Sequence, residues 1–534
     1  MADRPLSAAE QDKIKHVIAA FTSCINKSTL LDLASRLSDT YSTLAKSSLD
    51  QFLVTPVTAL PTGKEKGKFI SIDVGGSNVR VGFVELLGEV QAGHGNNENQ
   101  DAVKVEEKIR RSYDRSWPIG DHLKMDKAED LFGWIGDCIA EVIMDALDDV
   151  PPTAESPFGD ELLLGITFSF PMAQKSLSEA TLLPMGKGFA ITSDLNLGKM
   201  LLAGYSRHIE GNGHSEEPPS SKKRHSCLPR IRIAAITNDT VATFASLAYA
   251  VKAAPNSRVA VGLIVGTGTN ATVPMPLADL HPAKKDDLAN PDQVKTVVIN
   301  TEWTIRGTEQ PLLDLDIKTH WDLMLDANSD RPGFQPFEYM TAGRYLGEIV
   351  RLVFADLCLQ GNNGYLPPSL QTKNAILTRF LSEVVARADN ETLKEELEKT
   401  FPPIGSPTPF WITARVQLLR DVATAVQQRS SALIATACVG LLDCVHDIHI
   451  DRPSQATQNG YAVHGSETEE LVIAYAGGTI SQYPKWLETC QHWIDVLVEG
   501  GSKKNVGKKV VLREALDGGI IGAGVLAGMT DDIA

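Results

Sequence analysis

The carboxylate of Asp239 lies at a junction between two predicted elements that suits it for chemistry. The apolar, β-branched run 231–236 predicts a buried strand, and the run 242–248 predicts a helix. A side chain between them lies at the carboxyl end of a sheet, where α/β folds bind their ligands. Two interpretations stay open on these residues alone: Asp239 takes a proton from a substrate, or it only caps the helix.

Two glycine-rich turns, each directly after a predicted strand, have the composition of phosphate-binding turns. The first follows a strand that ends at Asp73, and the second follows the strand 259–265. Glycines let the backbone approach a ligand, and consecutive turn amides form an anion-binding nest. Asp73 is placed to hold a water of a hydrated Mg²⁺, although a plain hairpin is the simpler alternative for the first turn. The candidate residues are Gly75, Gly76, Ser77 and Asn78 in the first turn and Gly266, Thr267, Gly268 and Thr269 in the second.

A lysine between two glycines, Gly186-Lys187-Gly188, lies in the loop beyond the predicted strand 161–170. Little shields such a side chain, so it is able to reach a phosphate or a sugar hydroxyl. The alternative is an exposed turn. Amphipathic helices are predicted at 129–149 and 337–353, where apolar residues recur at helical spacing.

Length and charge set outer limits on the function. At 534 residues the chain is too long for one core, which predicts two large lobes. A net charge of −16 argues against general affinity for nucleic acid or an anionic membrane. The seven cysteines form no C-x-x-C pair, which indicates reduced thiols in an intracellular compartment and no structural zinc. The first residues do not resemble a signal peptide, and no apolar run approaches the ~18 residues that span a bilayer.

The expected location is therefore the cytoplasm, with nuclear or mitochondrial-surface association left open. The composition changes at 211–230, which predicts a surface insertion. This segment contains a basic triplet, Lys222-Lys223-Arg224, of the kind found in nuclear import signals. Short basic triplets are common, so the triplet alone does not decide the compartment.

In their order along the chain, these motifs resemble the eukaryotic hexokinase family, including its atypical fungal members. The resemblance runs from about residue 50 to 530 and includes Asn300-Thr301-Glu302-Trp303 and Phe337-Glu338, followed by 345–352. It implies an α/β, two-lobed actin-like hexokinase fold, with mixed sheets flanked by helices around a central cleft. The implied division gives residues 69–207 and 512–534 to a small lobe, and residues 1–68 and 208–511 to a large lobe.

The resemblance also implies roles for the candidate residues. Asp239 is the expected general base for the 6-hydroxyl of a hexose, glucose first, and Lys187 is expected to assist it. ATP with Mg²⁺ is the implied phosphoryl donor, with Asp73 holding the metal through water. Arg80 joins the two turns in the expected phosphate site. The expected sugar contacts are Ser169, Lys187, Asn238, Asp239, Asn270, Glu302 and Glu338.

The chain departs from the family pattern at four places. The family usually has Thr at Gly186, and it has Phe at Arg306 within a Gly-Ala-Phe-Gly segment. We expect Arg306 to crowd the wall behind Glu302 or to pair with it. On the adenosine side, Asp-Gly-Ser becomes Ala476-Gly477-Gly478, and a Ser becomes Gly519. These losses predict weaker ATP binding than is usual in the family.

Two functions stay open on this basis. The first is ATP-dependent phosphorylation of a hexose at its 6-hydroxyl. The second is a sugar-binding regulator of the carbon or nutrient response with little or no turnover, which implies a regulatory protein partner. The retained Asp239 and Lys187 favour the enzyme, whereas Gly186, Arg306 and the missing adenosine Asp favour the regulator.

Overall fold

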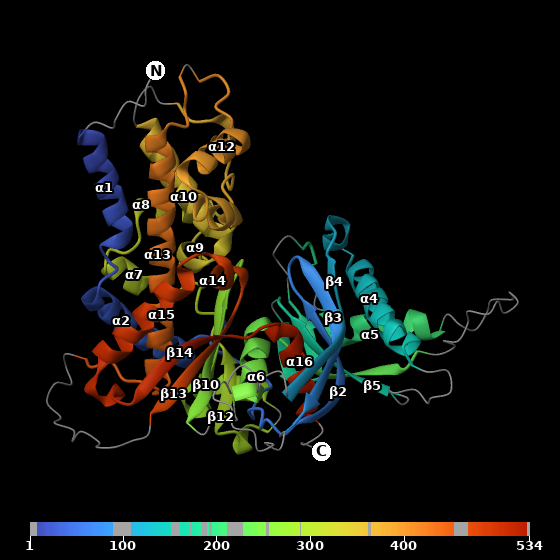
Figure 1. Ribbon diagram of the computed structural model, residues 1–534. Coiled ribbons are helices and arrows are strands. Elements are labelled where there is room, and N and C mark those ends of the chain that lie inside the picture. The colour runs from blue at the N-terminus through green and yellow to red at the C-terminus, as the bar shows by residue number, and fades with distance from the viewer. Residues whose placement is uncertain are drawn as a thin grey trace, which may run out of the picture.

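Two bodies, each built on its own sheet, make up the protein (Figure 1). The structure is a computed structural model, and it describes most of the chain. The described residues are 8–88, 108–125, 127–150, 158, 161–170, 172–183, 189–191, 195–210, 228–251, 256–288, 290–360, 365–406, 408–452 and 468–530. The predicted insertion at 211–230 lies outside them except for its last three residues.

The smaller body contains a mixed five-stranded sheet in the order β4-β3-β2-β5-β9. The edge strand β4 and its neighbour β3 pair antiparallel, as do β3 and β2, while β2, β5 and β9 run parallel. A small antiparallel sheet, β6-β7-β8, lies alongside. The elements are β2 (Lys66–Val74), β3 (Asn78–Leu87), β4 (Ile109–Pro118), α4 (Ala128–Asp148), β5 (Glu161–Phe168), β6 (Met172–Ser176), β7 (Glu179–Leu182), β8 (Leu195–Asn196), α5 (Leu197–Glu210) and β9 (Arg230–Thr237).

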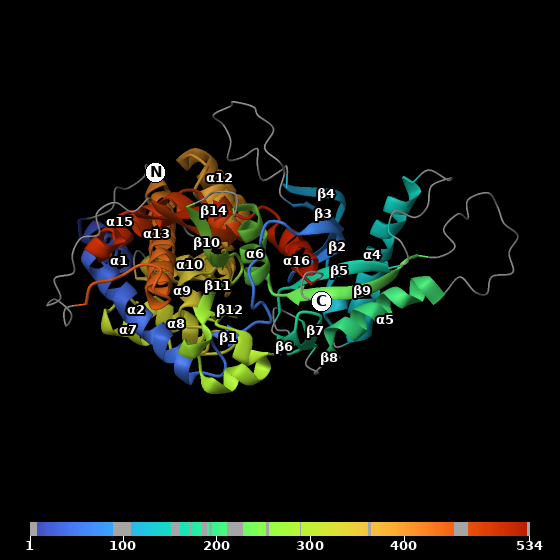
Figure 2. The same ribbon diagram turned by 90° about the horizontal axis from the view of Figure 1, so that it is seen from below.

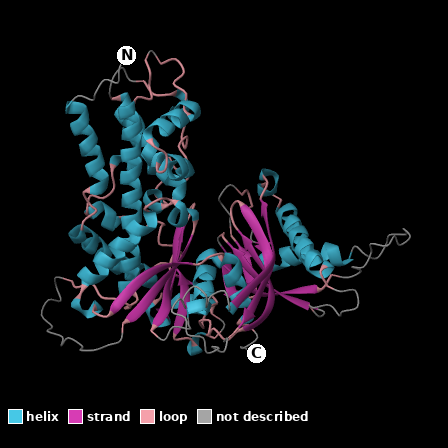
Figure 3. Cartoon of the chain, in the orientation of Figure 1, coloured by secondary structure: helices cyan, strands magenta, loops and turns pink. Residues whose placement is uncertain are grey.

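The larger body contains a six-stranded sheet in the order β1-β12-β11-β10-β13-β14. Long helices stand on one side of this sheet, away from the smaller body (Figure 3). Its strands are β1 (Leu53–Val54), β10 (Ser257–Val265), β11 (Thr269–Pro276), β12 (Thr296–Asn300), β13 (Glu469–Ala476) and β14 (Lys508–Glu514). Its helices are α1 (Ala8–Thr22), α2 (Lys27–Ser47), α7 (Gln310–Asp314), α8 (His320–Ala327), α9 (Glu338–Thr341), α10 (Gly343–Leu359), α11 (Thr378–Phe380), α12 (Asn390–Thr400), α13 (Thr413–Cys444), α14 (Gly478–Gln482) and α15 (Trp486–Gly501).

Two helices, α6 (Asp239–Val251) and α16 (Gly518–Gly528), lie side by side between the sheets in both views (Figures 1 and 2). Apolar residues of both helices share one core with residues of both sheets, such as Val84 on β3 and Val472 on β13. The opposite face of the smaller sheet packs on α4 and α5, and the opposite face of the larger sheet packs on α2, α13 and α15. The elements that carry the candidate site therefore form the joint between the two bodies.

The predicted strands and turns around the site are confirmed, whereas the single helix predicted at 337–353 is wrong: extended backbone at Ala342 divides it into α9 and α10. The run 231–236 lies in β9, and α6 begins two residues after that strand ends. Both glycine-rich turns connect antiparallel hairpins, β2–β3 and β10–β11. One detail bears on the expected lobe boundaries: β9, assigned with the large lobe, is the edge strand of the five-stranded sheet because it pairs with β5.

Candidate active site

Asn238, and not Asp239, caps helix α6. The Asn238 Oδ1 accepts hydrogen bonds from the backbone N–H of Val241 and from the hydroxyl of Thr240, both at 2.9 Å. This is the bond that defines a helix N-cap, so the interpretation of Asp239 as the cap is wrong. Asp239 is the first residue of α6 and is half-buried, and its carboxylate makes no hydrogen bond or ion pair with the part of the chain that the structure describes.

Amide and carboxylate side chains converge where β11 begins and β12 ends. The Asn270 Nδ2 donates to the Asn300 Oδ1 at 2.7 Å and to the Glu302 Oε1 at 2.9 Å. The Asn300 Nδ2 donates to the same Glu302 oxygen at 2.7 Å. Antiparallel pairing of β11 with β12 brings these residues together although they are about 30 positions apart. Such groups grip sugar hydroxyls, because each hydroxyl is both donor and acceptor.

The backbone of Glu302 has a positive φ of 47°, which is uncommon for a residue with a side chain. Its N–H donates to the Asn270 Oδ1 at 3.1 Å, and its carbonyl oxygen accepts from the Gln51 Nε2 at 3.2 Å. Strained conformations of this kind persist where the surroundings over-determine them, and they gather at functional sites. Both bonds therefore hold the backbone from which the Glu302 carboxylate extends.

Glu338, the first residue of α9, faces the second glycine-rich turn. Its carboxylate accepts hydrogen bonds from the backbone N–H of Thr269 at 3.2 Å and from the Gln335 Nε2 at 3.0 Å. Gln335 and Asn300 are not among the residues predicted for this site. Their positions in the sequence could have indicated them, because Gln335 lies three residues before Glu338 and Asn300 lies two residues before Glu302.

Two expected sugar residues come from the smaller body. The backbone N–H of Ser169 donates to the Val74 carbonyl oxygen at 3.0 Å, which ties the residue after β5 to the end of β2. Ser169 thus lies beside the first glycine-rich turn. Lys187 and Gly186 lie outside the described residues, so their roles stay predictions.

Asp73 is the penultimate residue of β2 and approaches the start of α16. Burial raises the pKa of its carboxyl to about 6, and repulsion from Asp239 and Asp517 adds to this, while Arg80 opposes it. A Cβ added at Gly519 would lie 2.5 Å from the Asp73 Oδ2, so no larger residue fits there without displacing Asp73. Glycine at 519, where the family usually has Ser, is therefore what allows Asp73 to occupy this position.

The first turn is closed by a hydrogen bond from the Gly75 N–H to the Asn78 carbonyl oxygen at 3.0 Å. Ser77 and Asn78 are exposed at its tip. Arg80, expected at the phosphates, pairs with Asp517 at 3.1 Å, and Arg111 pairs with the other oxygen of the same carboxylate. Asp517 thus links β3 and β4 to the start of α16.

The second turn is wedged between α10 and α14. The carbonyl oxygen of Gly266 accepts from the Gly343 N–H at 2.8 Å and from the Thr479 hydroxyl at 2.9 Å. Gly477 has a φ of 117°, and a Cβ there would lie 2.5 Å from the Val265 carbonyl oxygen, so glycine is required. The Thr269 hydroxyl is buried without a hydrogen-bond partner among the described residues. An orphaned hydroxyl and a rigid turn fit a ligand that supplies oxygen acceptors.

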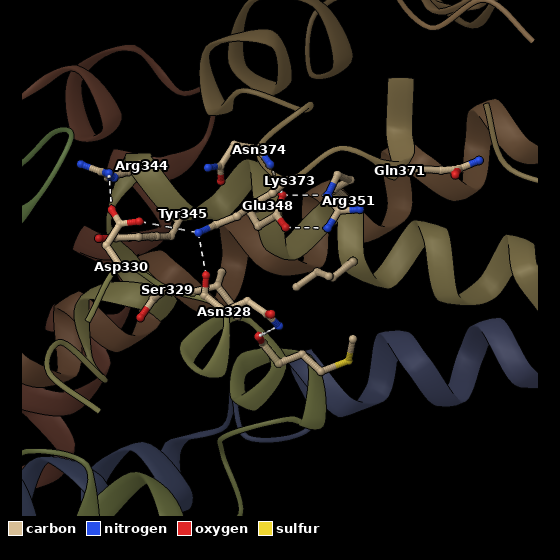
Figure 4. Close-up of a pocket in the computed structure, with 13 residues that line it drawn as sticks. Asn328, Ser329, Asp330, Arg344, Tyr345, Glu348, Arg351, Gln371, Lys373 and Asn374 are labelled. Atoms are coloured by element: carbon tan, nitrogen blue, oxygen red, sulfur yellow. Dashed lines mark hydrogen bonds and ion pairs between the residues drawn. The ribbon is translucent and has the colours of Figure 1, made fainter. Parts of the chain in front are cut away.

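A groove of about 230 Å³ lies next to this turn, between α8, α10 and residues 371–374 (Figure 4). Arg344, whose N–H donates to the Thr267 carbonyl oxygen, directs its guanidinium to Asp330 at 3.0 Å. Lys373 pairs with the same carboxylate at 3.7 Å. No predicted site residue lines this groove, and its three cations, Arg344, Arg351 and Lys373, are all paired with carboxylates, so it is not the predicted sugar site.

Arg306 neither crowds the wall behind Glu302 nor pairs with it. Its guanidinium bonds to Asp50 at 3.0 Å, and both side chains are about two-thirds exposed, at 64% and 67%. Its backbone N–H donates to the Phe334 carbonyl oxygen at 2.8 Å, which turns the side chain outward. The expectation that this departure alters the sugar wall is therefore wrong.

We expect Arg306→Ala to change the KM for sugar less than twofold and the melting temperature little. An exposed ion pair contributes about 0–1 kcal/mol to stability, and Arg306 has no contact with the amide and carboxylate cluster. Steady-state kinetics with varied sugar would measure this. A large rise in that KM would mean that Arg306 turns inward when sugar binds.

A divalent cation fits this site only as a partner of phosphate groups. No group of three His, Cys, Asp or Glu side chains able to hold a metal exists among the described residues. Mg²⁺ does not need one, because it keeps several waters and binds through one or two carboxylates together with substrate phosphates. Asp73, beside the first turn, is the carboxylate that suits this role.

Comparison with known proteins shows which family this chain resembles. Models of the hexokinase family match residues 13–249 and 260–529. Hexokinase-9 of rice is 28% identical over 483 residues, covering 89% of this chain and 81% of its own. A hexokinase of Schistosoma mansoni is 33% identical over 346 residues, or 64% of each chain. The structure of hexokinase from Schistosoma mansoni complexed with glucose superposes with a TM-score of 0.70 at 24% identity, covering 98% of this chain and 99% of that one.

Two sheets flanked by helices, with polar side chains and two glycine-rich turns at their joint, define an actin-like, two-lobed sugar kinase. Within that class, this chain belongs to the hexokinase family. No helix of sufficient length and apolar character to cross a membrane occurs in the described part of the chain.

Proposed function

We propose that this protein transfers the terminal phosphoryl group of ATP to the 6-hydroxyl of a hexose, with glucose as the first candidate. The observation that carries the proposal is the half-buried carboxylate of Asp239, which is not used for capping, at the joint between the bodies. Membership of the hexokinase family supports the reaction class. The glucose complex of the Schistosoma relative supports the choice of sugar.

In the proposed reaction, Asp239 accepts the proton of the 6-hydroxyl as that oxygen attacks the phosphoryl group. Asn238 keeps its Nδ2 for a sugar oxygen, because its Oδ1 caps α6. Asn270, Glu302 and Glu338 hold the other hydroxyls, and Ser169 and Lys187 close the sugar site from the smaller body. Positioning of this kind supplies much of the rate enhancement in phosphoryl transfer.

The nucleotide phosphates are proposed to lie between the two glycine-rich turns. Gly75, Gly76, Ser77, Asn78 and Arg80 offer donors from one side, and Gly266, Thr267, Gly268 and Thr269 from the other. Mg²⁺, held through water by Asp73, supplies neutralisation of the phosphate charge when it is bound. Arg80 reaches a phosphate only by releasing or sharing Asp517, so we expect nucleotide binding to alter that ion pair.

The lobe boundaries expected from sequence are kept as a proposal, except that β9 (Arg230–Thr237) is proposed to belong to the small lobe because it pairs with β5 in the five-stranded sheet. The regulatory alternative is not favoured, because the matching family and the relatives named above are hexokinases. The cytoplasm remains the proposed location. Six cysteines in the described ranges are buried and unpaired, which is consistent with a reducing compartment.

The direct test is ADP formation with glucose, fructose or mannose in a coupled assay, together with calorimetric titration of each sugar. We expect turnover with at least glucose. Saturable sugar binding without any turnover would favour the regulatory alternative. Absence of both sugar binding and turnover would contradict the proposal.

Gly478 and Gly519 stand where the family has Ser, and we expect substitution by serine to have opposite effects at these two positions. A Cβ at Gly478 meets only the side chain of Gln482, at 3.9 Å, whereas a Cβ at Gly519 collides with Asp73. We therefore expect Gly478→Ser, with Asp introduced at Ala476, to lower the KM for ATP about two- to fivefold through one added hydrogen bond. Gly519→Ser should raise that KM. Kinetics with varied ATP would decide, and a lower KM for Gly519→Ser would show that α16 moves when nucleotide binds.

A further inference from the structure

Lys284 is a buried lysine whose ammonium group meets backbone oxygens instead of a carboxylate. It lies in a short 3-10 helix (Pro282–Asp287), and its side chain extends under the end of α2. Its Nζ donates to the Gln51 carbonyl oxygen at 2.8 Å and to the Ala45 carbonyl oxygen at 3.0 Å. Only 3% of the residue is exposed. The lysine therefore fixes the chain that leaves α2.

Holding this charge has a cost to stability. Burial lowers the pKa of Lys284 to about 8, and no ion pair joins it to a carboxylate within the described ranges. The nearby Asp50 is paired with Arg306 at the surface. Because the native state favours the neutral amine, the cost is present below pH 8 and is relieved as the pH rises from there toward the lysine's ordinary value. Such a cost needs an explanation other than stability.

The segment that Lys284 holds lies directly beside Glu302. Gln51, also 3% exposed, donates its Nε2 hydrogen to the Glu302 carbonyl oxygen at 3.2 Å. The next residue, Phe52, donates its N–H to the Thr301 carbonyl oxygen at 3.0 Å, and β1 then pairs with β12. Phe52 and Glu302 both have positive φ, at 50° and 47°. Two strained residues thus flank one backbone hydrogen bond, since Phe52 donates it and Glu302 follows its acceptor, Thr301.

We propose that Lys284 and Gln51 are positioning residues that hold Glu302 in its strained, sugar-facing conformation. The inference rests on the proposed role of Glu302 as a sugar contact. Lys284 acts on the backbone of Gln51, and the Gln51 side chain acts on the backbone of Glu302, so neither residue touches the substrate. The bond from Lys284 to the Gln51 carbonyl oxygen and the bond from the Gln51 side chain to Glu302 can be removed separately. A change in the Gln51 side chain leaves the Gln51 carbonyl oxygen available to Lys284.

The experiment compares Gln51→Met and Lys284→Met with the unchanged protein. Each substitution removes donors while keeping a long side chain. We expect both to raise the KM and the dissociation constant for glucose by about tenfold, with the KM for ATP changed less than twofold. The double variant should match the single ones, since both residues act along one path. If Lys284→Met does not fold, Gln51→Met alone carries the test.

Lys508→Met is the matched control. Lys508 also donates to a backbone carbonyl oxygen, that of Asp447, and in addition pairs with Glu469 at 3.5 Å, but it begins β14 at the sheet edge opposite β1. It should leave the KM for glucose unchanged, because its loss perturbs structure away from Glu302. Glu302→Gln distinguishes failure of the positioning role from failure of the proposed sugar site. If it weakens glucose binding while Gln51→Met and Lys284→Met do not, the positioning role is overturned; if it has no effect, the proposed sugar site fails and the inference fails with it.

Discussion

Replacing Asp239 with asparagine is expected to lower kcat by about 10²–10⁴, the usual contribution of a positioned general base. The acceptor hydroxyl attacks poorly until its proton has somewhere to go, and asparagine cannot accept it. Sugar affinity should change little, because size and most hydrogen bonding are kept. A coupled assay for ADP would give kcat, and glucose titration would give affinity.

Helix capping does not confuse this result. Asn238 supplies the capping oxygen of α6, so the bonds to Val241 and Thr240 survive the change at Asp239. Asp389→Asn is a matched control, since Asp389 caps α12 through the Thr392 N–H at 2.8 Å and lies on a distant helix. Turnover close to that of the unchanged protein in Asp239→Asn would show that another group takes the proton.

Asn270→Asp is expected to weaken glucose binding by about 10²-fold. The new carboxylate can still accept the N–H groups of Ala271 and Glu302, so the backbone there should hold. It cannot donate to Asn300 or to Glu302, whose carboxylate oxygen lies 2.9 Å from the present Asn270 Nδ2. Two half-buried carboxylates would then face each other, and Glu302 would keep only the Asn300 Nδ2 as its amide donor among the described residues, so charge repulsion adds to the lost hydrogen bond.

The pH dependence of this variant provides a check. Like charges at short range raise the pKa of one partner, so a proton shared between the two carboxylates restores a donor on the acid side. The loss of affinity should therefore shrink as the pH falls and be largest at alkaline pH, measured by calorimetry. Asn390→Asp on α12, whose amide bonds to Gln417 at the surface, is the control. A pH-independent loss would indicate that the site has collapsed.

The sequence by itself determined the local parts of the site. A β-branched run followed by Asp239 predicts a strand–helix junction, and pairs of glycines after strands predict tight turns, because both signals depend on neighbours along the chain. The order of these motifs also indicated the family, with the fold that follows from it. Lobe boundaries were less accessible, since the pairing of β9 with β5 depends on a partner about 70 residues away.

Only the tertiary structure decided how side chains share their hydrogen bonds. The neighbouring sequence does not show that Asn238, and not Asp239, caps α6. It also does not show that Arg306 points outward to Asp50, which is 256 positions earlier. Lys284 and Gln51 are 233 positions apart, and no spacing rule relates them. A polar group bonds to whichever partner the fold brings within about 3 Å. The residue types of a site are thus legible in sequence, whereas the partners that orient them are set by contacts between distant segments.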